Sequence, residues 1–187
     1  MVKRTQQSNT NTEYFITFTC LNWLHLFQKS NAYDAFYKWF NYLNENTFNL
    51  LGYVIMPNHF HGIIHIPADS KKDINQLVAN GKRFIAYEII KGLKEKKENS
   101  LLALLSKGLT NQEIKKGQKH KVFKSSFDCK EIMHIQMLQI KLDYIHKNQC
   151  QGKWNLVNAY TDYPYSSAAF YELDTENKWL TSYAEIY

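Results

Sequence analysis

The sequence predicts a single α+β domain with an antiparallel, ferredoxin-like sheet. Segments rich in β-branched and aromatic residues alternate with segments whose apolar residues recur at helical spacing. Their order is strand, helix, strand, strand, helix, strand, which is the βαββαβ arrangement with helices on one face of the sheet. The 187 residues suit one domain, and a hydrophobic content of 44% suits a compact core.

The first half of the chain supplies three of the strands and one helix. The first strand is predicted over residues 14–20, which read Tyr-Phe-Ile-Thr-Phe-Thr-Cys. A helix follows over residues 32–46, where apolar residues recur every three or four positions. The second and third strands, 48–56 and 59–66, are joined by Pro57-Asn58, a turn tight enough to make them antiparallel neighbours.

The second half completes the sheet and adds a third helix. A helix is predicted over residues 73–93 with Asp73 as its N-cap. Residues 99–118 are expected to form a basic insert at the surface. The fourth strand is predicted over residues 120–127, and Asp128 is then expected to cap a helix from Lys130 to about Asn148. This third helix is therefore expected to lie on the face of the sheet that the other two helices do not cover.

The two ends of the chain are predicted to be peripheral. Residues 1–11 are expected to be flexible, and residues 150–187 are expected to pack on the core as a tail. No segment has the length of a membrane span, and the polar N-terminus has no apolar signal core, which predicts a cytoplasmic protein without membrane contact. Three cysteines without a Cys-x-x-Cys pair predict neither a disulfide framework nor a structural zinc site.

Positive charge is concentrated in one stretch of the chain. The formal net charge is +6, and ten lysines but only three glutamates lie between Lys91 and Lys124. Such a concentration attracts a phosphate backbone and therefore indicates nucleic acid as a partner. A solvated lysine-rich face explains the same composition, so the charge alone leaves both interpretations open.

Two histidines at the start of the third strand are candidate metal ligands. His59 and His61 point to one face because side chains alternate along a strand, whereas Phe60 points to the other layer. Their backbones lie about 7 Å apart, so both imidazoles can reach one cation. His65 shares the face but lies about 13 Å from His61, too far to join them. A His-x-His pair in a strand is also commonly structural.

The third helix supplies the rest of the candidate site. Its apolar residues form two stripes on nearly opposite sides, which predicts a helix buried between two layers. Tyr144 and Asn148 are four residues apart and share one face, whereas Asp143 and His146 point to other sides of the helix and are expected at the surface. With that face against the histidines, Asn148 adds a carbonyl oxygen to two imidazoles, a set that suits Mg²⁺ or Mn²⁺ holding a phosphate.

A tyrosine over the open coordination position predicts phosphodiester transfer. A phenol has a pKa of about 10, so it needs a neighbouring cation or base and an activated electrophile. The metal activates the phosphate by neutralising charge that builds on its oxygens. Attack by Tyr144 leaves a covalent phosphotyrosine and a free DNA hydroxyl, and the retained bond energy allows a later strand to be joined without ATP. A tyrosine on an apolar face also commonly packs with its hydroxyl in water.

These motifs resemble one known group of enzymes. The hexapeptide 56–61, Met-Pro-Asn-His-Phe-His, followed by Tyr144-Ile145-x-x-Asn148, resembles the single-tyrosine HUH transposases and especially the REP-associated tyrosine transposases. The likeness extends over nearly the whole chain. It includes Lys82-Arg83-Phe84, the stretch 123–132, and the tail sequence 163–167, Tyr-Pro-Tyr-Ser-Ser.

The resemblance implies cleavage of single-stranded DNA through a 5′-phosphotyrosine intermediate. It implies His59, His61 and Asn148 as ligands of Mg²⁺ or Mn²⁺ and Tyr144 as the nucleophile. Gln149 is the alternative third ligand, because this chain has Asn-Gln where the family frequently has Asn-Pro. Family members recognise imperfect DNA hairpins beside the cut site, and they act either as monomers or as dimers that exchange the tyrosine helix.

The expected DNA contacts are four basic residues around the lysine-rich stretch: Lys82, Arg83, Lys121 and Lys124. Lys82 and Arg83 are equally consistent with solvent-exposed charges. The insert 99–118 has no counterpart in the family, and Phe123-Lys124 stands where relatives often carry Trp-Gln. Target specificity therefore does not carry over from the resemblance.

Three classes of function fit the sequence. The first is a transposase or endonuclease that cleaves and rejoins single-stranded DNA through Tyr144. The second is a domesticated protein that binds DNA hairpins and no longer transposes. The third is a metal-dependent nuclease that uses water, in which Tyr144→Phe would retain activity. The intact set of histidines, tyrosine and asparagine favours the first.

Overall fold

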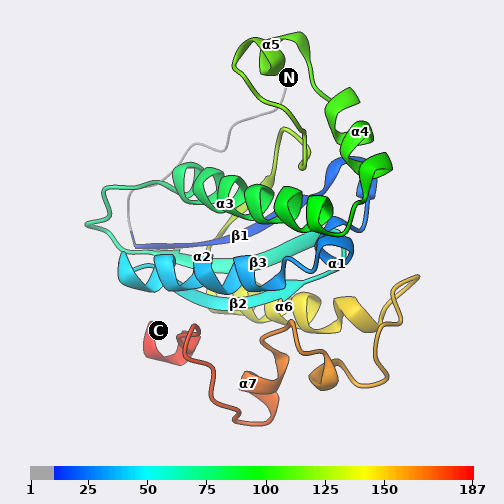
Figure 1. Cartoon of the computed structure of the whole chain (residues 1–187). Coiled ribbons are helices and arrows are strands. Elements are labelled where there is room, and N and C mark those ends of the chain that lie inside the picture. Colours follow the sequence, from blue (N-terminus) through cyan, green and yellow to red (C-terminus); the bar gives the residue numbers. More distant parts are fainter. Residues whose placement is uncertain (1–10) are drawn as a thin grey trace.

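The computed structural model describes residues 11–187 and contains a four-stranded antiparallel sheet with helices on both faces (Figure 1). The strands are β1 (Thr12–Thr19), β2 (Asn49–Ile55), β3 (His59–Ile66) and β4 (Asp128–Ile132), in the spatial order β2-β3-β1-β4. The predicted α+β class with an antiparallel sheet is confirmed. Most of the segment 1–11, predicted to be flexible, lies outside the described residues.

Two long helices cover one face of the sheet. These are α2 (Tyr33–Glu45) and α3 (Ile74–Glu95), and the short α1 (Leu26–Ser30) precedes them. The layer between these helices and the sheet contains many aromatic side chains. The even-numbered residues of β3 point into it. The Phe60 ring, for example, lies 5.0 Å from Phe18 of β1. The predicted Asp73 cap of α3 is confirmed as part of a capping box with Gln76.

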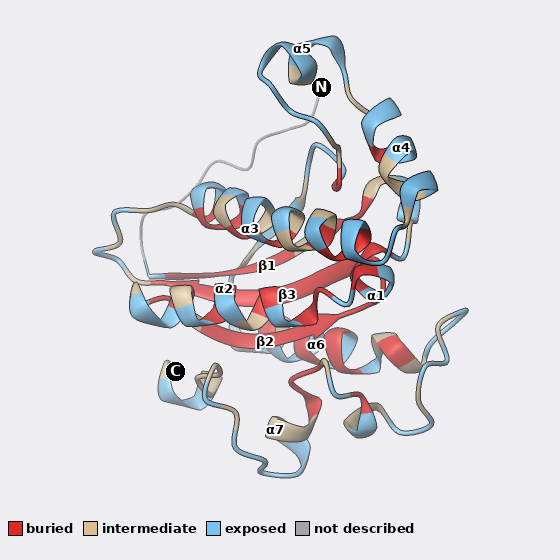
Figure 2. Cartoon of the chain, viewed as in Figure 1, coloured by how far each residue is buried: buried red, intermediate tan, exposed pale blue. Residues whose placement is uncertain are grey.

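The helix α6 (Ile135–Lys147) lies on the other face of the sheet (Figure 1). It packs on β2 and β3, where Leu138 and Leu142 contact a second apolar layer that includes Val54 and Ile63. The odd-numbered residues of β3 therefore face α6, and the even-numbered ones face α2 and α3. Because both faces are covered, every residue of β3 is buried (Figure 2).

The C-terminal segment covers the edge of β2 that does not pair with β3. Its backbone pairs with that strand, since Ile55 N donates to the Tyr165 carbonyl and Ser167 N donates to the Tyr53 carbonyl, at 2.8 and 2.9 Å. The hydroxyl of Tyr163 also donates to the Ile55 carbonyl. A covered edge leaves no row of free backbone groups for pairing with other chains. The segment contains α7 (Ala168–Glu172) and the 3₁₀ turns Tyr160–Asp162 and Tyr183–Glu185.

The region predicted as a basic insert forms two short helices that project from the sheet (Figure 1). They are α4 (Asn99–Lys107) and α5 (Asn111–Lys115), and most of their residues are exposed (Figure 2). Leu105 is the buried residue that anchors α4, and its carbonyl accepts a hydrogen bond from Lys121 N. Within residues 11–187, no helix combines the length and hydrophobicity that crossing a membrane requires.

The prediction of the fourth strand was wrong by one segment. Residues 120–127 are extended, but they pair with the sheet only through an isolated bridge between Phe123 and Cys20. The fourth strand is instead β4, which pairs with β1 over five residues. It is an edge strand with Asp128, Lys130 and Glu131, and charges of this kind protect an edge but hide the strand pattern.

The predicted start of the last helix was wrong for the same reason. Residues 128–132 belong to β4, so α6 begins at Ile135 rather than Lys130. Its N-cap is His134, whose Nδ1 accepts a hydrogen bond from Met137 N at 3.2 Å, and not Asp128. Asn148 follows the last residue of α6 as its C-cap and opens a 3₁₀ turn, Asn148–Cys150.

A glycine lets α6 approach the sheet closely. Gly52 lies at an irregularity in the pairing of β2 with β3. A Cβ at this position would lie 2.4 Å from Leu142 Cδ2, well inside contact distance. The absence of a side chain at Gly52 therefore sets how near the tyrosine-bearing helix lies to the histidine strand.

We expect Gly52→Ala to lower the free energy of unfolding by about 1–3 kcal/mol, the usual cost of overpacking a filled core. Leu142→Val removes the atom that the new methyl group would meet, so the double variant should recover part of this loss. Chemical denaturation of the two single variants and the double variant measures the coupling. If the losses in free energy of unfolding of the two single variants simply added in the double variant, position 52 and Leu142 would not be in close contact.

Candidate functional site

A groove of about 670 Å³ lies where β3 begins and β1 ends. Both candidate histidine ligands and the candidate nucleophile line it, together with side chains from β4 and the segment before it. We call it the histidine groove. Its lining residues are Phe15, Thr17, Thr19, Trp23, His59, His61, Lys124, Ser126, Phe127, Asp128, Lys130, Lys141 and Tyr144.

The two histidines face each other and are held neutral. Their ring centroids lie 4.8 Å apart, and each residue is only 5% exposed. Burial lowers the pKa of His59 to about 4. Burial also lowers the pKa of His61 to about 3, and the nearby His59 and Lys141 add to this shift. A neutral imidazole keeps a lone pair on one ring nitrogen, which is the form that binds metals.

Hydrogen bonds on the far side of each ring select the nitrogen that carries this lone pair. His59 Nδ1 donates to Asn58 Oδ1 at 2.7 Å, because an amide oxygen can only accept. The His61 Nδ1 is 2.6 Å from Thr17 Oγ1, its partner across the β1–β3 pairing. Nδ1 is the donor in His59, and it is the donor in His61 when the Thr17 hydroxyl accepts; Nε2 is then left to bind a cation, as is usual for metal-binding histidines.

Two buried polar atoms at this point lack a hydrogen-bond partner. They are His61 Nε2 and Asn148 Oδ1, and the Asn148 side chain lies beside His59. An unpaired buried acceptor costs about 1–3 kcal/mol, so such atoms call for an explanation. A divalent cation bound to both imidazoles and the Asn148 amide oxygen would satisfy them. The residues present thus fit the predicted ion.

The other candidates for this ion make contacts of their own. Gln149, the alternative third ligand, donates its amide Nε2 to the Tyr160 carbonyl at 2.9 Å in the C-terminal segment, and its buried Oε1 also lacks a hydrogen-bond partner. His65 is hydrogen-bonded to Glu13 at 2.9 Å near the far end of β3. Among residues 11–187, no three His, Cys, Asp or Glu side chains are grouped to hold a metal. An amide is therefore the third ligand that the geometry offers.

Tyr144 projects from α6 into the histidine groove. Its ring lies 5.2 Å from His61 and makes an edge contact with Phe15 at 6.1 Å. Tyr144 is 45% exposed, and Ile140 on the same side of the helix is 66% exposed; Met133, of the same predicted stripe, lies before the helix and is 74% exposed. The prediction that α6 is buried between two layers was therefore wrong. One stripe packs on the sheet, and the other borders the groove and solvent.

A lysine on the same helix was missed by the sequence reasoning. Lys141 Nζ lies 4.8 Å from the Phe15 ring centroid and 6.0 Å from that of Tyr144. Its position three residues before the tyrosine is a helical neighbour position and could have identified it. Thr17 was also missed, because its partnership with His61 depends on the pairing of β1 with β3.

One neighbour of the tyrosine does not lie at the surface as predicted. Asp143 is exposed and pairs with Lys147 at 2.8 Å, but His146 is only 3% exposed. The Nε2 of His146 lies 2.9 Å from Ser167 Oγ, which itself contacts the backbone of Tyr53 in β2. This buried polar link joins α6 to the C-terminal segment and β2, so the role of His146 is to seat the helix.

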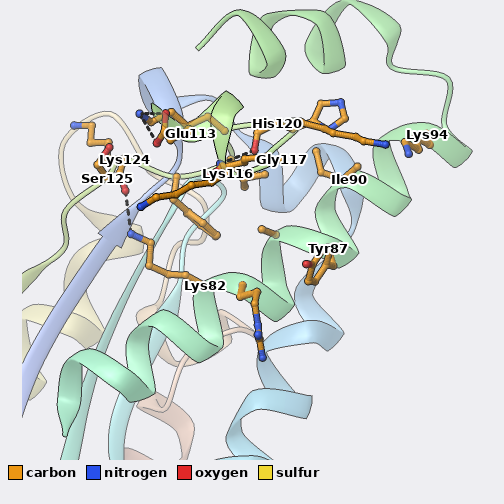
Figure 3. A pocket seen from close by; sticks show the side chains of 17 residues that line it. Lys82, Tyr87, Ile90, Lys94, Glu113, Lys116, Gly117, His120, Lys124 and Ser125 are labelled. Atoms are coloured by element: carbon orange, nitrogen blue, oxygen red, sulfur yellow. Dashed lines mark hydrogen bonds and ion pairs between the residues drawn. The ribbon is translucent and has the colours of Figure 1, made fainter. Parts of the chain in front are cut away.

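The predicted DNA-contacting residues line a second depression of about 680 Å³ between α3 and residues 113–125 (Figure 3). We call it the lysine cleft. Its charged lining residues are Lys82, Arg83, Lys94, Glu113, Lys116, Lys119, Lys121 and Lys124, with His120 beside them. Lys124 lines both this cleft and the histidine groove. The two depressions are therefore adjacent.

The four predicted contacts are not equally free. Lys82 donates to the Lys124 carbonyl at 2.9 Å, as Figure 3 shows, and burial lowers its pKa to about 8. Lys121 is paired with Glu113 at 3.0 Å. Arg83 and Lys124 are exposed. Lys82 and Lys121 thus hold the cleft wall in place, whereas Arg83 and Lys124 present charge to solvent.

The fold is similar to a solved structure of a REP-associated tyrosine transposase bound to a REP hairpin. The TM-score is 0.61 at 15% sequence identity, and the match covers 97% of this chain and 94% of that chain. A candidate transposase from Deinococcus radiodurans R1 matches with a TM-score of 0.43 at 15% identity over 79% of this chain and 98% of that chain, too weakly to support an argument. No protein-family model and no curated protein matches the sequence. The predicted resemblance is confirmed at the level of the fold.

We expect Mn²⁺ to bind the wild-type protein, and we expect His61→Ala or Asn148→Ala to abolish that binding. Thr17→Val should weaken it by about 10- to 100-fold, because the threonine orients a ligand without touching the ion. Titration followed by electron paramagnetic resonance of free Mn²⁺ measures each affinity.

His65→Gln is the matched control for this titration. His65 lies on the same strand and face and is equally buried, but it is bonded to Glu13. Its substitution should leave the Mn²⁺ affinity unchanged. Equal affinity of Asn148→Ala and wild type would exclude the amide as a ligand.

Proposed function

We propose that this protein is a metal-dependent single-strand DNA transposase or endonuclease that cleaves and rejoins DNA through Tyr144. The proposal includes a ferredoxin-like catalytic core, Mg²⁺ or Mn²⁺ as the ion, and a DNA hairpin as the recognised structure. One observation carries it. Two neutral imidazoles and an exposed tyrosine line one groove, and a buried amide oxygen without a partner lies beside one of the imidazoles.

The residues of the groove suit each step of phosphodiester transfer. The Tyr144 oxygen attacks phosphorus and loses its proton to solvent, since the groove is open. The bond from phosphorus to the 3′ oxygen breaks, and that oxygen leaves as a 3′-hydroxyl after taking up a proton. The 5′ phosphate stays on Tyr144. A later 3′-hydroxyl attacks the phosphotyrosine, restores the diester and releases the tyrosine. A bound divalent ion supplies charge neutralisation at the phosphate oxygens.

Side chains around Tyr144 are arranged to hold its ring in place and to put a positive charge beside it. Phe15 packs beside both His61 and the tyrosine, with ring distances of 5.6 and 6.1 Å, and so limits the directions that the phenol can take. Lys141 places an ammonium group near both rings. A nearby cation stabilises the negative charge that develops on the phosphate in the transition state, which is one demand of this chemistry.

The surface charge supports nucleic acid as the substrate. Lys124 joins the histidine groove to the lysine cleft, so a strand leaving the groove meets positive charge. The similar structure was solved with a REP hairpin bound, which supports a hairpin as the recognised element. We propose that the cleft takes the backbone of the DNA that adjoins the cut site.

We expect the wild-type protein to form a covalent adduct with labelled single-stranded hairpin DNA in Mn²⁺ or Mg²⁺. Tyr144→Phe should form none, because it lacks the attacking oxygen, and a chelator should abolish the adduct. A hairpin library resolved on denaturing gels detects the product. Tyr187→Phe, which changes an exposed tyrosine outside both depressions, is the control and should react like wild type.

The other outcomes separate the remaining classes of function. Equal cleavage by wild type and Tyr144→Phe without an adduct would indicate a nuclease that uses water. Tight hairpin binding without cleavage across the library would indicate a DNA-binding protein that no longer transposes.

We expect Lys141→Met to slow adduct formation at least about tenfold, because it removes a charge that favours the transition state. Lys141→Arg should retain most of the rate. Single-turnover kinetics with saturating DNA separate this loss from weaker binding. Lys147→Met removes an exposed lysine of the same helix outside the groove and should not change the rate. A Lys141→Met rate equal to wild type would remove the lysine from the mechanism.

A further inference from the structure

An exposed tryptophan borders the histidine groove in a strained conformation. Trp23 is 49% exposed and lines the groove beside His59, with 5.8 Å between the two ring centroids. Its φ is 57° and that of Asn22 is 52°, both in the left-handed region. This region disfavours residues with bulky side chains, so strain of this kind indicates a function when the surrounding structure maintains it.

The strain is maintained by Asn58, the residue that orients His59. Asn58 is fully buried, and its amide Nδ2 donates to the Trp23 carbonyl at 2.7 Å. The Oδ1 of the same amide accepts the hydrogen bond from His59 Nδ1. One side chain therefore fixes the backbone of Trp23 and the imidazole of His59 relative to each other.

Positive charge surrounds the indole. Lys124 Nζ lies 4.5 Å from its ring centroid, and Lys153 Nζ lies 5.8 Å away. An exposed aromatic ring among lysines is the usual construction for single-stranded nucleic acid, because bases stack on the ring while the cations contact phosphates. Stacking of a base is worth more than an exposed cation–π contact, so a base can displace an ammonium group from the ring face.

We propose that Trp23 is a stacking platform for a base of single-stranded DNA, next to the two histidines of the groove. The inference rests on the proposed function for its substrate and names the contact that positions the strand. A purely structural indole would be buried in the core, as Trp39 is at 2% exposure. Half of Trp23 instead faces the groove that contains Tyr144.

Binding measurements with two single strands of equal charge test this proposal without requiring cleavage. The probes are a 12-nucleotide thymidine strand and a 12-unit strand of abasic sites, and the protein carries Tyr144→Phe. We expect this parent protein, in which Trp23 is intact, to bind the strand with bases more tightly than the abasic strand. Trp23→Ala should weaken thymidine-strand binding by about 5- to 100-fold, the range for stacking one base, and leave the abasic strand unchanged. Fluorescence anisotropy gives both affinities.

Two further variants test whether the effect belongs to the indole. Trp23→Tyr should keep part of the preference, because a phenol still stacks. Phe84→Ala removes a ring of equal exposure on α3, outside the groove, and should keep all of it. Trp23→Gly should lose the preference yet unfold at a higher temperature than its parent, because glycine adopts a positive φ without strain.

The outcomes are distinct from those of the cleavage assay. Equal weakening of both strands by Trp23→Ala would assign Trp23 to structure or charge and overturn the platform, as would an unchanged preference or a parent protein without a preference. Base-dependent binding through Trp23 combined with no adduct from wild type would retain the platform and reject the transposase.

Discussion

The site depends on the buried amide of Asn58, at the turn that precedes β3. Its Oδ1 accepts from His59 Nδ1, its Nδ2 donates to the Trp23 carbonyl, and its backbone carbonyl accepts from Cys20 N at 2.8 Å. These bonds tie the end of β1, the turn that carries Trp23 and the start of β3 to one residue. A fully buried amide with both ends bonded has one orientation, so the imidazole that it contacts has one tautomer.

The positions of Tyr144 and Asn148 depend on how α6 packs on the sheet. Gly52 admits the helix close to β2, and the contact between His146 and Ser167 fixes it through the C-terminal segment. That segment also covers the edge of β2, so one stretch of chain protects the sheet and holds the nucleophile's helix. Asn148 then projects from the end of α6 beside His59. Distant parts of the chain thus meet through packing rather than through one local motif.

The sequence allowed the central sheet to be predicted because its inner strands are buried on one or both sides and read as apolar runs. The edge strand β4 was displaced by one segment in the prediction, since its charged residues follow the rules for edges and not for cores. The histidines, Tyr144 and Asn148 could be grouped from periodicity within single elements. Thr17 and Trp23 could not, because their positions depend on strand pairing and on a left-handed turn that tryptophan rarely adopts.

The two halves of the site meet opposite physical demands. The imidazoles need burial, which keeps them neutral and leaves His61 Nε2 and Asn148 Oδ1 without partners. In the proposed function Tyr144 needs access to a DNA strand, and it is exposed. A strand covered on both faces provides the first environment, and a helix packed on one side provides the second. Each unpaired atom costs about 1–3 kcal/mol of stability, a cost that a bound cation would remove. The fold therefore buries the histidine half of the site and leaves Tyr144 open, as the proposed function requires.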